Sequence, residues 1–166
     1  MPVTDALAFV HGTPTVPVAI CHSASEYSAS ELDFGVPATG AATPYLTEFP
    51  SATEKGYTFP PEVVGAGGVE WGLHIIVGAA FDTLTDINFQ VCTSATTNAL
   101  YSVAGNVIAA RDLSLAQLQV VGAHYFVPVN QAAVKEFLRF YAALTGSAAS
   151  NGTIAAWFGP RTGGEQ

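Results

Sequence analysis

Short runs of β-prone residues, separated by Gly, Asn, Asp and Pro, fill the chain from residue 69 onward. In the clearest run, residues 86–93, the apolar Ile87, Phe89 and Val91 alternate with mostly polar side chains. Because successive side chains of a strand point to opposite faces, this alternation predicts a strand with one buried face. Short strands at such spacing are typical of a sandwich or barrel, so we predict an all-β sandwich of about eight strands.

Other segments fit the same fold. Three further strands are predicted over residues 70–77, 123–129 and 152–158. Pro128 places the second of these at an edge or at a strand end, because proline cannot donate a hydrogen bond to a neighbouring strand. Residues 111–118 are predicted to be a connector in which Asp112 caps one helical turn.

Residues 134–144 fit two structures. Their apolar side chains recur at the helical spacing i, i+3, i+4, i+7, i+8, at positions Val134, Phe137, Leu138, Tyr141 and Ala142. Against a helix, the segment is rich in aromatic residues and Gly146 ends it early. Both readings stay open on the residues alone, and the family resemblance given below favours a strand.

The length of 166 residues is that of one domain, which we assign to residues 1–166. Residues 69–158 are expected to form the main part of the sandwich. Residues 36–68 hold half of the ten prolines and little alternation, which predicts an extended loop or arm insertion. This insertion either orders against a neighbouring protein or packs on its own domain. Residues 1–22, with three further prolines, are predicted to form an N-terminal arm.

The composition favours a component of an assembly. Apolar residues make up 49% of the chain and charged residues 11%, against roughly 25% charged in a typical soluble protein. The surface must therefore be largely neutral, and a neutral surface is easily desolvated against a partner. The net charge of −8, with only five basic residues, argues against a nucleic-acid partner.

Cysteine usage and the N-terminal residues bear on the compartment. Cys21 and Cys92 are predicted to be reduced, structural thiols, which fits a reducing compartment. Neither a basic leader region nor a stretch of membrane-spanning length is recognised, so we expect no membrane partner and a protein made in the cytoplasm.

Catalytic and metal-binding patterns are not found in the sequence. It has no phosphate-binding loop and no serine nucleophile elbow, and His22 beside Cys21 would point to the opposite face of a strand. The histidines do not show the spacing of two on one strand that cupin-type metal sites use; they are His11, His22, His74 and His124. Asp82 and Asp86 flank a turn without the spacing of a calcium loop. We predict no enzyme, no catalytic residue, no cofactor and no metal.

Several large aromatic side chains fit a core, a protein interface or a carbohydrate platform: Trp71, Tyr125, Phe137, Tyr141 and Trp157. The residues alone leave these three uses open.

The order of segments resembles one protein family. The matching segments are residues 31–35 (ELDFG), 72–77 (GLHIIV), 87–94 (INFQVCTS), 110–113 (ARDL), 126–129 (FVPV), 137–141 (FLRFY) and 152–156 (GTIAA). Together they resemble the capsid cement, or head decoration, proteins of tailed bacteriophages. The resemblance implies a jelly-roll fold and a strand over residues 134–144, with no cofactor and no active site. The insertion at 36–68 departs from the family pattern.

The function implied is to bind the assembled bacteriophage head and stabilise it by bridging coat subunits. The partners would be the major capsid protein and further copies of this chain, as a homodimer or homotrimer, on the outer surface of a virion assembled in the host cytoplasm. Residues in the insertion are the predicted protein interface, namely Tyr45, Phe49, Tyr57 and Phe59. The alternative is a carbohydrate-binding jelly-roll module, and a metal-dependent β-barrel enzyme is a third reading.

Overall fold

The computed structural model describes residues 9–33, 70–95, 106–130, 133–135, 137–161 and 163–166. Within these residues the chain forms strands and one helical turn: β1 (Phe9–His11), β2 (Val18–Ala19), β3 (Glu26–Tyr27), β4 (Leu32–Asp33), β5 (Trp71–Ala79), β6 (Leu84–Ser94), β7 (Val107–Ser114), α1 (Leu115–Leu118), β8 (His124–Pro128), β9 (Phe137–Gly146) and β10 (Thr153–Pro160). The predicted all-β class is therefore confirmed.

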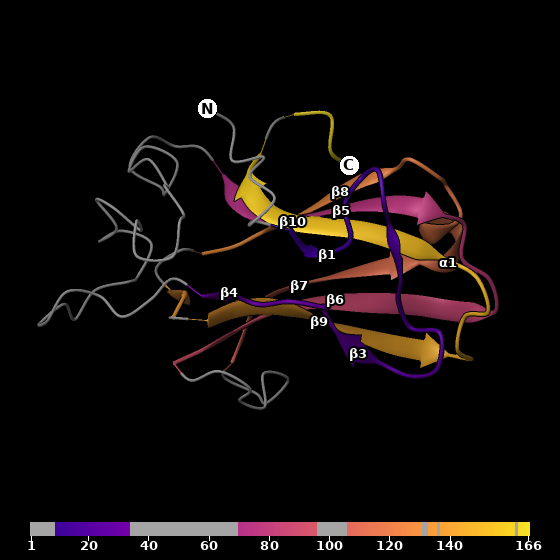
Figure 1. The fold of residues 1–166 in the computed structure, drawn as a ribbon, viewed down its shortest axis with the longest axis horizontal. Helices are drawn as coiled ribbons and strands as arrows, with labels where there is room; N and C mark the ends of the chain where they lie inside the picture. Colours follow the sequence, from indigo (N-terminus) through magenta and orange to yellow (C-terminus); the bar gives the residue numbers. More distant parts are fainter. Residues whose placement is uncertain (1–8, 34–69, 96–105, 131–132, 136, 162) are drawn as a thin grey trace, which may run out of the picture.

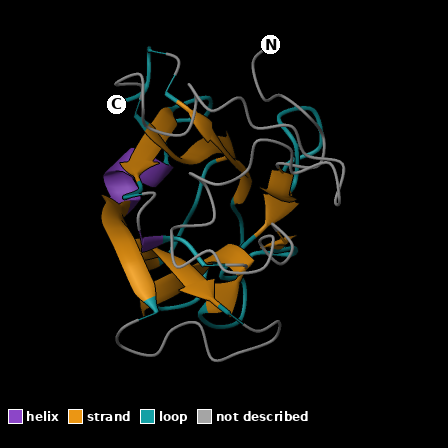
Figure 2. Ribbon diagram, turned by 90° about the vertical axis from the view of Figure 1, so that its left-hand side faces the viewer, coloured by secondary structure: helices purple, strands orange, loops and turns teal. Residues whose placement is uncertain are grey.

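The strands form two antiparallel sheets that lie face to face (Figure 1). The β5 sheet has the order β1-β10-β5-β8, and β2 also pairs with β10. The β6 sheet has the order β3-β9-β6-β7, and β4 also pairs with β9. Figure 2 views the two layers end-on, with α1 at their side. Because α1 follows β7 of one sheet and precedes β8 of the other, it connects the two layers at this side.

The connectivity is that of a jelly roll. β1 and β2 pair with successive parts of β10, so together they act as one interrupted edge strand. β3 and β4 pair with successive parts of β9 in the same way. In the described part of the chain each sheet therefore has four strand positions, and the chain passes repeatedly between the sheets, as in double Greek-key sandwiches. The predicted jelly-roll sandwich of about eight strands is confirmed.

The core lies between the inward faces of the two sheets. On β5 the side chains of Leu73, Ile75 and Val77 are buried in it, and on β6 those of Ile87 and Phe89 are buried as well. The alternation in the sequence therefore predicted the inward face of β6 correctly. Strand side chains of the opposite parity lie on the outer faces of the sandwich.

Three predictions about local structure have clear outcomes. Residues 137–146 form β9, so the strand reading of residues 134–144 is confirmed over this part. The connector predicted over residues 111–118 is wrong in its first half, because residues 111–114 continue β7, and Ser114, not Asp112, is the N-cap of α1. The Gln117 side chain accepts the Ser114 backbone N–H, which stabilises this start.

The N-terminal arm predicted over residues 1–22 is wrong for residues 9–19. These residues contain β1 and β2, which hydrogen-bond to β10, so they belong to the β5 sheet. The side chains of Val10 and Ile20 are buried in the core, so this stretch packs as part of the domain. Residues 1–8 and the insertion at 36–68 lie outside the described residues.

Both cysteines, Cys21 and Cys92, are buried and free, as predicted. Among the residues that the structure describes, no helix has the length and apolarity that would let it cross a membrane.

Candidate functional site

A cluster of polar side chains lies on the outer face of the β5 sheet. His74 is on β5 between Leu73 and Ile75, which both point into the core, so its own side chain points outward. The side chain is nevertheless buried, at 1% exposure. A buried polar ring on an outer face requires partners, because burying a polar group without hydrogen bonds is costly.

Two aromatic rings hold the His74 imidazole from either side. Trp157 of β10 is its direct partner on one neighbouring strand and Phe126 of β8 its direct partner on the other. The Trp157 ring stacks on His74 with centroids 4.9 Å apart and planes 1° from parallel. Phe126 meets it edge-on, with centroids 4.9 Å apart. The orientation of the imidazole is therefore fixed by side chains on rigid strands.

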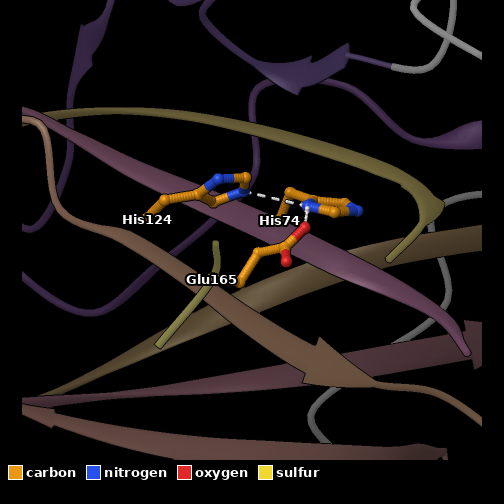
Figure 3. Close-up of side chains that lie close together, drawn as sticks. All are labelled: His74, His124 and Glu165. Atoms are coloured by element: carbon orange, nitrogen blue, oxygen red, sulfur yellow. Dashed lines mark hydrogen bonds and ion pairs between the residues drawn. The ribbon is translucent and has the colours of Figure 1, made fainter. Parts of the chain in front are cut away.

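His124 and Glu165 converge on one nitrogen of this ring (Figure 3). His124 begins β8 and lies diagonal to His74, because the register pairs Ile76 with His124. Its Nε2 is 2.9 Å from His74 Nδ1. The carboxylate oxygen Oε1 of Glu165 is 3.5 Å from the same Nδ1, and the Glu165 side chain has 0% exposure.

Glu165 is held over the sheet by its neighbours in the closing segment, which we define as residues 163–166. The backbone N–H of Gln166 donates to the carbonyl of His124 at 2.8 Å. Arg111, reaching from β7 of the other sheet, donates to the Gln166 carbonyl at 2.5 Å and to the Phe126 carbonyl at 2.9 Å. The second carboxylate oxygen, Oε2, is 4.0 Å from Nε of Arg161. The closing segment is thus tied to both sheets.

Hydrogen bonding determines which His74 nitrogen carries the proton. Nε2 lies 3.0 Å from the carbonyl oxygen of Pro160, and a carbonyl can only accept, so Nε2–H donates. In the neutral ring Nδ1 then carries a lone pair, which accepts the Nε2–H of His124. That lone pair points to the place where the His124 and Glu165 side chains meet.

Both imidazoles favour the neutral form. Burial, together with the neighbouring His124, lowers the pKa of His74 to about 4. Burial also lowers the pKa of His124. The cause is the cost of placing a charged ring away from water. At neutral pH the cluster therefore combines two imidazole lone-pair donors with one carboxylate.

This donor set is one that transition metals use. One nitrogen from each histidine and one oxygen of Glu165 lie within 4.8 Å of one another. Two histidines and a glutamate are a zinc-binding set, and the His74 Nε2–H donated to a backbone carbonyl is the outer contact that orients metal-binding histidines.

The spacing of the histidines along the chain did not reveal this grouping. Cupin-type sites place two histidines on one strand, whereas His74 and His124 lie on neighbouring strands and Glu165 comes from beyond the last strand. A signal was present in the run 72–77, where His74 interrupts an otherwise apolar or small sequence. Its partners depend on the register between β5 and β8, which the alternation does not reveal.

The other candidate residues are placed as follows. The predicted interface residues Tyr45, Phe49, Tyr57 and Phe59 lie outside the described residues. Cys21 is buried while its neighbour His22 is exposed, and the pair shares no site. Asp82 accepts hydrogen bonds from Ser150 and Asn151, so it joins two loops.

The large aromatic side chains are mostly internal. Trp71 and Tyr125 are 1% exposed and belong to the main core. Phe137 and Tyr141 form a smaller cluster with Cys92, on the outer side of the β6 sheet. Trp157 is half-buried against His74.

No model of a known protein family matches the chain, and no curated protein matches it significantly.

Proposed function

We propose that this protein is a capsid cement protein that binds the assembled head of a tailed bacteriophage and stabilises it by bridging coat subunits. The jelly-roll fold supports this proposal only in a general way, because one fold serves many functions. The observation that carries it is the scarcity of charge on the described surface.

Among the side chains whose burial the structure describes, few charged ones are exposed, namely Glu70, Asp112, Lys135 and Arg161. Two of these neutralise each other, since Arg161 and Glu70 form an ion pair of 2.5 Å. Asp112 accepts a hydrogen bond of 2.6 Å from Asn88. A surface of this kind loses little hydration energy when a partner covers it, which suits a protein that works while bound to a lattice.

Exposed apolar side chains lie at one end of the β5 sheet, where they offer a contact surface: Val16, Val18, Val120 and Val121. Val18 pairs with Ile154 of β10, and Ile154 pairs with Val77 of β5. Gly122, next to Val121, donates its backbone N–H to the Val77 carbonyl. The four valines therefore flank the same end of one sheet, and we call them the valine end.

The mechanism is thermodynamic linkage. A protein that binds only the expanded, assembled shell stabilises that shell by its binding free energy. Many weakly bound copies act together, and a dimer or trimer of this chain would match a local symmetry axis of the shell. The major capsid protein is the proposed partner, on the outer surface of the virion.

The alternative, a carbohydrate-binding module, finds less support. Such a module presents aromatic rings to solvent, on which sugar rings stack. None of the phenylalanine, tyrosine and tryptophan side chains whose burial the structure describes is exposed, and the exposed large apolar residues there are the four valines.

Co-sedimentation with expanded heads that lack a decoration protein tests the proposal. We expect saturable binding to expanded heads, weak binding to unexpanded shells, and increased resistance of the decorated heads to heat. Val121→Asp places a charge at the valine end and is expected to weaken binding, whereas Ala110→Asp, on the exposed side of β7, is the matched control. Absence of binding to either form of the shell would reject the cement function.

A further inference from the structure

We propose that His74, His124 and Glu165 form a Zn²⁺ site that fastens the closing segment to the outer face of the β5 sheet. This inference does not depend on the cement function, because it rests on the geometry of three side chains alone.

The two distances to His74 fit a zinc ion with small adjustments, and the His124 and Glu165 ligand atoms, within 4.8 Å of each other, would move closer together. With metal–ligand bonds of about 2.0–2.1 Å, tetrahedral ligand atoms are about 3.3 Å apart. The distance of 3.5 Å between His74 Nδ1 and Glu165 Oε1 is close to this value. The distance of 2.9 Å between His74 Nδ1 and His124 Nε2 must increase by about 0.4 Å. Zinc would then replace the hydrogen bond between the two imidazoles by a bond to each, with the His124 proton carried on Nδ1 in place of Nε2.

The His74 ring is already prepared for this role. Its Nε2–H donates to the Pro160 carbonyl, so the Nδ1 lone pair, which accepts from His124, is the one directed at the metal position. Stacking on Trp157 prevents the ring from turning away. Metal ligands on strands that are fixed by packing lose little conformational freedom on binding.

The chemistry of the donors selects the ion. Two imidazole nitrogens and one carboxylate oxygen suit Zn²⁺ and similar transition metals, whereas Ca²⁺ and Mg²⁺ prefer oxygen ligands throughout. Arg161 approaches the other carboxylate oxygen, Oε2, so Oε1 is the atom directed at His74. Three protein ligands leave one coordination position for water.

Burial indicates that the role is structural. The side chains of His74 and Glu165 are 1% and 0% exposed and His124 is half-buried, so a substrate would have little access to the fourth position. The three ligands come from β5, from β8 and from the closing segment, so one ion would cross-link all three. A metal that binds only the folded arrangement stabilises it by linkage.

The first test is metal stoichiometry in the full chain. Protein stripped with a chelator is titrated with ZnCl2 by calorimetry, and bound zinc is counted by mass spectrometry after gel filtration. We expect one Zn²⁺ per chain. Glu165→Gln and His124→Gln each remove one ligand and are expected to weaken binding by at least the roughly 10- to 100-fold that loss of an outer contact costs. His22→Gln changes an exposed histidine outside the cluster and should bind as the unchanged chain does.

The second test addresses the fastening. Arg161 is 45% exposed and precedes the closing segment, so trypsin can cut after it. Zinc is expected to slow this cleavage in the unchanged chain and in His22→Gln, but not in Glu165→Gln. A chain that takes up no stoichiometric zinc, or variants that bind it as tightly as the unchanged chain, would overturn the site. Zinc binding without protection at Arg161 would overturn the fastening role.

Discussion

The Asp82 carboxylate accepts a hydrogen bond of 2.7 Å from the backbone N–H of Ser150, a residue 68 positions later in the chain. The same carboxylate accepts from the Ser150 hydroxyl at 2.5 Å and from the backbone N–H of Asn151 at 3.1 Å. It therefore joins the β5–β6 connection to the β9–β10 connection, across the two sheets. The sequence predicted only that Asp82 flanks a turn, whereas in the structure its carboxylate cross-links two loops.

This cross-link predicts an acid-sensitive component of stability. The hydrogen bonds from Ser150, and then those from Asn151, hold the pKa of Asp82 well below its usual range. Because the folded-state pKa is depressed, the contribution is fully present above the unfolded pKa of about 3.9 and is lost as the pH falls toward the folded value. Urea unfolding midpoints of the unchanged chain should therefore fall below about pH 4 more steeply than those of Asp82→Asn. Parallel curves for the two proteins would contradict the prediction.

Gly152 is predicted to be irreplaceable. Its φ is +121°, a backbone angle that residues with a side chain rarely adopt, and a Cβ there would lie 2.4 Å from the ring of the buried Phe81. Gly152→Ala should therefore reduce the free energy of unfolding by more than the roughly 1–3 kcal/mol that such backbone strain alone costs. Gly122→Ala is the control, since Gly122 also has positive φ, +81°, but nothing within 4 Å of its Cβ position. Equal losses in urea unfolding would show that the Phe81 contact is unimportant.

Neighbouring residues of β9 are predicted to differ strongly in their contribution to stability. Phe140 is 0% exposed and packs against Phe89 in the core, with ring centroids 5.7 Å apart. Phe140→Ala should lower the free energy of unfolding by about 3–5 kcal/mol, through lost burial and the cavity left behind. Tyr141 points to the opposite face and is half-buried against Tyr27, so Tyr141→Ala should cost less. Denaturant unfolding of the two variants measures this difference, and a larger loss for Tyr141→Ala would contradict the assigned faces.

Both thiols are predicted to be unreactive in the folded protein. Burial raises the pKa of Cys21 to about 12, with a further contribution from the charge of Glu26, and burial raises the pKa of Cys92 to about 12 as well. At pH 8 a thiol with this pKa has on the order of a thousandfold less thiolate than an unperturbed cysteine. Labelling with a thiol-reactive disulfide reagent should be very slow without denaturant and rapid for both cysteines in urea. Rapid labelling of either cysteine in the folded protein would count against its burial.

The local pattern of the sequence was a good guide to the strands. Alternation identified β6, and short apolar runs identified β5, β8 and β10, because the side-chain period of two is a property of each strand by itself. The same approach assigned residues 9–19 to an arm, since β1 and β2 are too short to show a period and become strands by pairing with β10.

The amino-acid sequence by itself determined the all-β class, the inward faces of the long strands and the low charge of the surface, because these depend on residue type and local spacing. The tertiary structure alone decided that His74, His124 and Glu165 meet. Their meeting depends on the register of β8 against β5 and on the return of the closing segment over the sheet. Both are set by packing between segments far apart in the chain, which local periodicity does not encode.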